Sequence, residues 1–228
     1  MDYIIVGAFA IGIYVIVRGL NRRAVVAKRS RYIDSFTFPR TVSQRLKEKY
    51  PHLNDMQVCD VIEGLHDYFH ICNDAGKSMV SMPSQAVDVV WHEFILFTLQ
   101  YQNFCKKAFG RFLHHVPAEA MKTPTAAQKG IKLAWRLACQ RERISLVKPH
   151  RLPRLFALDG RLNIPDGFTY QLNCQQRAGA SGSSSGGYCA SHIGCSSSSS
   201  CSAGGGCGSS NGCSSSSGCS SGCGGGGD

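Results

Sequence analysis

Asp88 and His92 lie four positions apart, the spacing that brings two side chains together on one face of a helix. A carboxylate in contact with an imidazole holds the ring in one tautomer, as a metal-ligating or acid–base histidine requires. His114 and His115 follow further along the chain and can supply more nitrogens if that segment folds back. The candidate metal ligands are therefore Asp88, His92, His114 and His115. Such a set suits Zn²⁺, although the sequence identifies no cofactor.

The Asp88 and His92 pair also has a structural interpretation, which we favour. A buried histidine tied to an aspartate is an ordinary way to satisfy two polar groups in a helical core. No catalytic residue is therefore assigned, and the sequence favours a protein that is not an enzyme.

A second histidine pattern, E-x-x-H-x-x-x-H, is formed by Glu63, His66 and His70. It resembles half of a di-metal carboxylate site, but such sites need the half-motif twice and further glutamates on partner helices. Glutamate is too scarce in this chain to supply them, and the two histidines flank an apolar stripe. A solvated helix edge is the favoured interpretation.

The C-terminal region carries seven candidate thiols in a background of Ser and Gly. Six recur at every sixth position, and the full set is Cys189, Cys195, Cys201, Cys207, Cys213, Cys219 and Cys223. A disulfide-linked solenoid, a soft-metal site and a flexible low-complexity tail are all compatible with this repeat. We favour the flexible tail, because residues 174–228 offer too few apolar side chains to bury a core.

Helices must position the Asp and His residues, because the apolar spacing between Thr41 and Leu146 is helical. The pattern predicts helices over residues 41–50, 55–72, 84–109 and 126–146. The third is apolar around most of its circumference, which indicates a central helix. After Pro149, short pieces joined by turns are expected to pack Leu155, Phe156 and Phe168 onto the bundle. The predicted fold class is mostly α, with one helical domain at 41–173.

The N-terminus is predicted to be a single transmembrane helix at residues 1–20. Tyr3–Val17 is an uncharged apolar run, and a basic juxtamembrane segment at 21–40 follows it. The basic residues expected at the membrane interface are Arg18, Arg22, Arg23, Lys28 and Arg29. This charge order predicts a single-pass protein of the inner (plasma) membrane, with its N-terminus outside and its C-terminal domain cytoplasmic. Residues 1–31 are expected to contact membrane lipid.

The net charge of +10 does not by itself indicate nucleic-acid binding. Six of the basic residues lie within positions 18–31, next to the apolar run, and that segment contains no acid. No nucleic-acid partner is therefore predicted. Cysteines in the folded part, Cys59, Cys72, Cys105 and Cys139, are interpreted as small buried hydrophobic residues of a reducing compartment.

Residues 82–117, MPSQAVDVVWHEFILFTLQYQNFCKKAFGRFLHHVP, carry a recognisable signature. Its residues are Asp88, Trp91, His92, Tyr101, Phe104, Cys105, Phe109, Gly110, His115 and Pro117. In this pattern the chain resembles bacterial members of the glycine-rich domain-containing-protein-like family, over roughly residues 40–170. The plant relatives have a second histidine where this chain has Phe94, so a two-histidine site on that turn does not carry over. The resemblance implies a fold and no established activity.

Two function hypotheses follow from these observations. The first is a membrane-anchored, non-enzymatic interaction or scaffold module with an unidentified protein partner. The alternative is a metal-binding protein or metal-dependent enzyme that uses the Asp/His cluster, with the thiol-rich tail as a metal store.

Overall fold

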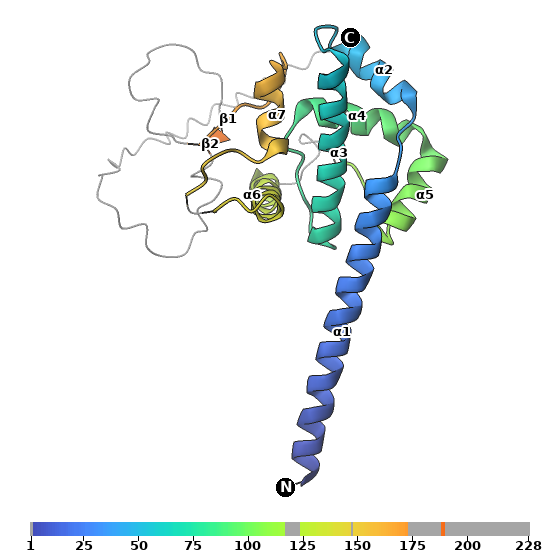
Figure 1. Ribbon diagram of the computed structural model, residues 1–228, viewed down its shortest axis with the longest axis vertical. Coiled ribbons are helices and arrows are strands. Elements are labelled where there is room, and N and C mark those ends of the chain that lie inside the picture. The colour runs from blue at the N-terminus through green and yellow to red at the C-terminus, as the bar shows by residue number, and fades with distance from the viewer. Residues whose placement is uncertain (1, 117–123, 147, 173–187, 190–228) are drawn as a thin grey trace, which may run out of the picture. The chain divides into compact units, whose positions relative to one another are not determined.

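The computed structural model describes residues 2–116, 124–146, 148–172 and 188–189 (Figure 1). The chain divides into two compact units, Met1–Ser196 and Ser197–Asp228. The second unit, and with it most of the predicted Gly/Ser/Cys tail, lies outside the described residues.

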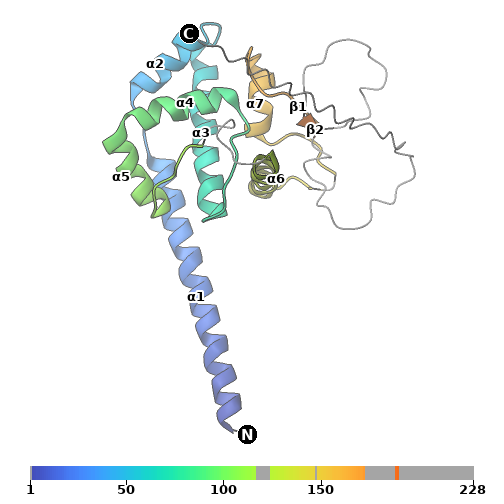
Figure 2. The same ribbon diagram turned by 180° about the vertical axis from the view of Figure 1, so that it is seen from behind.

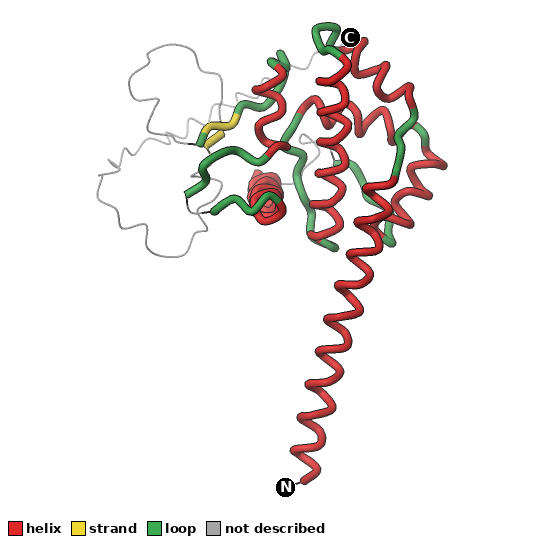
Figure 3. Tube along the Cα trace, in the orientation of Figure 1, coloured by secondary structure: helices red, strands yellow, loops and turns green. Residues whose placement is uncertain are grey.

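Seven helices and two short strands make up the described part of the first unit. The helices are α1 (Asp2–Ser35), α2 (Arg40–Lys49), α3 (Asp55–Ala75), α4 (Gln85–Leu96), α5 (Thr98–Phe109), α6 (Pro124–Arg141) and α7 (Arg154–Leu162). The strands are β1 (Tyr170–Gln171) and β2 (Tyr188–Cys189), which pair in parallel. Figure 3 shows how little of the chain is strand, so the mostly helical fold is as expected.

The prediction of a transmembrane helix is wrong. Within the described part of the chain, no helix is long and apolar enough to cross a membrane. The physical reason lies in the length of the apolar run. Its 15 residues, Tyr3–Val17, span only about 22 Å as a helix, against a hydrocarbon core of about 30 Å, and Arg18 ends the run. Lipid contact and localisation stay predictions.

α1 continues to Ser35, through most of the segment expected to be juxtamembrane, and its C-terminal part joins the core. Ile33 is buried, and Tyr32 and Phe36 pack against the core cluster. The Phe36 and Phe104 rings lie 4.6 Å apart between centroids, which ties α1 to α5. Residues 11–20, in contrast, are all exposed.

α3 is the central helix of the domain. It begins at Asn54, whose side chain accepts from the Gln57 backbone N–H while the Gln57 side chain accepts from the Asn54 N–H, a capping box. It packs against every other helix. In Figure 1 and in the reverse view of Figure 2, α3 lies between α6 and α7 on one side and α1 and α5 on the other.

The helix predicted over residues 84–109 is two helices, and it is not the central one. α4 ends at Leu96, and the Phe97 N–H donates to the carbonyl of Phe94 instead of continuing the helical ladder. Leu96 and Leu99 are exposed on either side of this break, at 72% and 71%. The apolar pattern seemed to surround one helix because two shorter helices, each with its own buried face, follow one another in the sequence.

Candidate metal centre

The first turn of α4, which carries Asp88, is fixed by a carboxylate from α7. Asp159 is buried and accepts hydrogen bonds from the Ser84 hydroxyl at 2.6 Å and from the backbone N–H groups of Gln85, Ala86 and Phe168. A negative charge at a helix N-terminus is favourable, because unpaired N–H groups and the helix dipole converge there. Asp159 thereby attaches the N-terminus of α4 to α7, one turn before Asp88.

His115 is brought to α4 by a loop that the signature residues hold in place. α5 ends at Gly110, whose φ of +67° lies in the left-handed region that favours glycine, and the chain then turns back. Trp91 Nε1 donates to the Tyr101 hydroxyl at 3.1 Å, and that hydroxyl donates to the Leu113 carbonyl at 2.6 Å. The loop is therefore pinned to α4 and α5 two residues before His115.

The three side chains that meet here are Asp88, His92 and His115. His115 Nε2 lies 2.9 Å from Asp88 Oδ1, and His92 Nδ1 lies 3.3 Å from Asp88 Oδ2. The two imidazole rings are 4.1 Å apart between centroids. The side chains of Asp88 and His115 are 19% and 12% exposed, whereas that of His92 is 50% exposed. The cluster therefore has a buried side and a side open to solvent.

This arrangement is compatible with a divalent metal ion. One ligand atom from each residue can be chosen so that all three lie within 4.8 Å of one another. Ligands about 2.1 Å from a tetrahedral ion lie about 3.4 Å apart, so small side-chain movements would close the site. Two histidines and one carboxylate leave coordination positions for water or a small molecule, as in catalytic zinc and non-haem iron sites.

The cluster lies in the wall of a cavity of about 780 Å³. α3, α4, the loop before α4 and the loop after α5 supply most of the wall, and α6, Phe168 and Tyr170 complete it. A volume of this size suits a small organic molecule. The open side of the Asp88 cluster therefore has room for a ligand.

Two buried side chains of the cavity wall, Cys72 and Tyr68, are uncharged. Burial raises the pKa of the Cys72 thiol to about 12. A hydrogen bond from Tyr68 and the charge of Arg111 act in the opposite direction and lower this pKa, but by less. Burial likewise raises the pKa of the Tyr68 phenol well above its usual value. Both groups stay protonated at neutral pH, so Cys72 is unsuited to act as a thiolate nucleophile or ligand.

Of the predicted metal ligands, His114 is the one that the structure leaves out of the cluster. It is exposed and packs on the Phe112 ring, at 4.9 Å between centroids. The basic residues predicted for a membrane interface, Arg18, Arg22, Arg23, Lys28 and Arg29, all lie on α1. Among the tail thiols, Cys189 lies in β2, and the other six are outside the described residues.

The solvated helix edge expected for His66 and His70 is wrong for His70. This side chain is buried, and its Nε2 lies 2.6 Å from Asp34 Oδ1 of α1. His66 is half-buried against the Phe38 ring. The expectation failed because α1 covers this side of α3, a contact that the sequence did not predict. Cys59 is likewise exposed instead of buried.

Two groups that build the site were not assigned to it from the sequence. Asp159 gave no signal, because a lone aspartate in a turn-rich segment has no characteristic spacing. Trp91 and Tyr101 were identified only as signature residues and core aromatics, and the hydrogen-bond chain from Trp91 through Tyr101 to Leu113 gives them a positioning role.

The residues of this site lie within a segment that matches a protein-family model. The model of the UCP032817-like family matches residues 28–193, which is more than two thirds of the chain. The chain belongs to the UCP032817-like family. Membership covers the C-terminal part of α1, the whole cavity wall and both strands, and so extends beyond residues 40–170 at both ends. No curated protein and no solved structure matches the chain.

Proposed function

We propose that this protein binds a divalent transition-metal ion, with Zn²⁺ the best fit, through Asp88, His92 and His115. The supporting observation is that three potential ligands from α4 and from the loop after α5 converge at the open edge of a cavity. Structural Asp–His pairs need one histidine and no cavity. Here two imidazoles, of His92 and His115, contact the Asp88 carboxylate, and all three residues line a cavity that can hold a ligand.

The metal would be presented to a small molecule in the cavity. Three protein ligands leave the remaining coordination positions free, and these would face the solvent-accessible side on which His92 is exposed. A bound water at such a position is acidified by the metal, and a carbonyl or phosphoryl oxygen there is polarised. The proposal is thus a metal-dependent enzyme or small-molecule-binding metalloprotein, the second of the two sequence hypotheses.

The likeness to glycine-rich domain-containing proteins is part of this proposal. It is supported by the way the signature residues act together: Trp91 and Tyr101 hold the loop, Gly110 turns it, and His115 reaches Asp88. The interaction-module hypothesis stays a prediction.

Zinc binding by the full chain in the presence of a thiol reductant tests the proposal. Asp88→Ala and His115→Ala should each remove one equivalent of tightly bound zinc, measured by elemental analysis after gel filtration. His114→Ala is the matched control, because it removes the neighbouring imidazole, which lies outside the cluster, and leaves the tail thiols intact. Equal zinc content in the His114 and His115 variants would contradict the proposal.

A further inference from the structure

The cavity beside the Asp88 cluster carries more positive than negative charge. Lys77 and Arg111 both line it, and Asp88 is the one carboxylate among the described lining residues. Asp88 is already engaged by two histidines, or by the proposed metal. The remaining positive charge is therefore available to a ligand.

Arg111 differs from several other arginines of the domain in having no carboxylate partner among the described residues. Arg141, Arg151 and Arg161 each form an ion pair. Arg111 instead donates to two backbone carbonyls, to Gly76 at 2.6 Å and to Phe112 at 3.4 Å, and no described carboxylate pairs with it. These carbonyls orient the guanidinium and leave its charge and several N–H donors unused.

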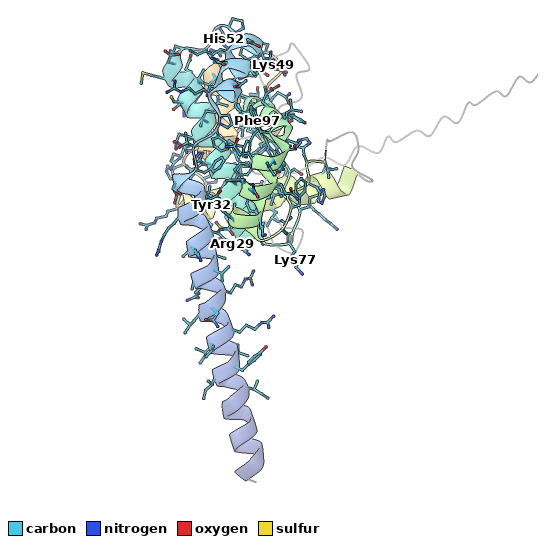
Figure 4. The ribbon with its side chains drawn as sticks, turned by 90° about the vertical axis from the view of Figure 1, so that its right-hand side faces the viewer. Arg29, Tyr32, Lys49, His52, Lys77 and Phe97 are labelled. Carbon is cyan, nitrogen blue, oxygen red and sulfur yellow. The ribbon has the colours of Figure 1, made fainter. Side chains whose placement is uncertain are left out.

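Two further arginines lie next to glycines that adjoin the lining residues Lys77 and Arg111 in the sequence. Arg22 of α1 lies beside Gly76, with its Nη2 3.8 Å from where a Cβ of that residue would stand, and Arg29 lies over Gly110. Figure 4 shows Arg29 and Lys77 at the end of the helical domain where α1 enters it. Such a concentration of one charge raises the local concentration of anions.

Much of the rest of the lining is apolar or aromatic. Trp91, Met82, Ile131 and Phe168 contribute to it. A volume of about 780 Å³ with this lining fits an organic molecule better than a hydrated inorganic ion.

We propose that the cavity binds a small organic anion, with its acid group held by Arg111 and Lys77 and its apolar body against Trp91. The inference rests on the proposed metal function for the chemistry done on this ligand, but the binding of the anion does not require the metal. Arg111 is suited to this role because its planar fork matches a carboxylate, sulfonate or phosphate in two hydrogen bonds.

Two dyes with the same aromatic skeleton test the proposal on the full chain. 1-Anilinonaphthalene-8-sulfonate carries an acid group, and N-phenyl-1-naphthylamine is its neutral analogue. Fluorescence titration with Arg111→Gln should weaken binding of the sulfonate dye about tenfold, the loss of one charged hydrogen-bonding group, and change binding of the neutral dye less than about twofold. Arg111→Lys should retain most of the affinity for the sulfonate.

The matched control is Arg136→Gln, an exposed cation of α6 that does not line the cavity. Equal sulfonate affinity in the Arg111→Gln and Arg136→Gln variants would overturn the inference. Repeating the titrations with a chelator measures anion binding in the absence of metal. The elemental analysis described above measures zinc binding separately, so the two proposals can fail independently. An Arg111 effect in a protein that binds no zinc leaves this inference standing and removes the metal function, whereas zinc binding without an Arg111 effect does the reverse.

Discussion

Two aspartate–histidine clusters, built from the same chemical groups, occupy different surroundings in this domain. His70 of α3 contacts Asp34 of α1 at 2.6 Å, and its ring is buried. His115 contacts Asp88 at 2.9 Å, but a second histidine joins it and a cavity lies alongside. The difference indicates that a histidine's role here depends on what surrounds the pair, and not on the pair itself.

The surroundings of His70 are those of a structural contact. Asn73, one turn later on α3, donates to the Val26 carbonyl and the Ser30 hydroxyl of α1. These polar contacts fix α1 on α3, next to the aromatic cluster around Phe36. None of these residues lines the cavity.

Replacing His70 should have the largest effect on stability. His70→Ala leaves a cavity in a packed helix interface and removes the hydrogen bond to Asp34, so we expect the free energy of unfolding to fall by about 3 kcal/mol. His92→Ala, at a half-exposed side chain, should change it by less than about 0.5 kcal/mol. Urea unfolding followed by circular dichroism measures both. An equal loss in the two variants would mean that both clusters are structural.

Tyr101→Phe should have an intermediate effect. The substitution leaves the Trp91 N–H and the Leu113 carbonyl without their partner, which costs about 2 kcal/mol. It also releases the loop that holds His115, so zinc affinity should fall while the ligands stay in place. Phe97→Leu, at the partly exposed break between α4 and α5, is a comparison variant that should leave zinc affinity unchanged. Wild-type zinc affinity in Tyr101→Phe would show that the loop is held by other contacts.

Above pH 9, the free energy of unfolding should depend on a buried thiol of the cavity wall, Cys72. The pKa of Cys72 is raised to about 12 in the folded protein from 9.0, so the folded state binds its proton more tightly. The stabilisation is complete below pH 9 and is lost as pH rises from about 9 to 12, by at most about 1.4 kcal/mol per pH unit for this group. Cys72→Ser should flatten the limb, and Cys59→Ser, at an exposed thiol, should not. Identical limbs in the two variants would contradict the burial of Cys72.

Local helix signals could be predicted from the sequence, and contacts between distant segments could not. The start of α3 at Asp55 and the shared face of Asp88 and His92 follow from local sequence patterns alone. The break at Phe97 has no Gly or Pro to mark it, and the docking of α1 on α3 was obscured by an apolar run that resembles a membrane segment.

The candidate site was partly predictable for the same reason. Asp88 and His92 share one helix, so their contact is local. The choice of His115 over His114 depends on the tertiary hydrogen bond from Tyr101 to Leu113, which sets the register of the loop. Arg111 gave no signal at all, because its lack of a carboxylate partner is visible only in the folded chain.

The most direct test of the central claim is a Co²⁺ titration of the full chain, followed by visible and near-ultraviolet absorption. Wild-type protein and Asp34→Asn should show the same saturable visible bands at one equivalent, without the near-ultraviolet charge-transfer band of cobalt–thiolate bonds, and Asp88→Asn should lose the visible bands. Cobalt bands that survive in Asp88→Asn, or that carry thiolate charge transfer in all three proteins, would contradict a metal centre at Asp88, His92 and His115.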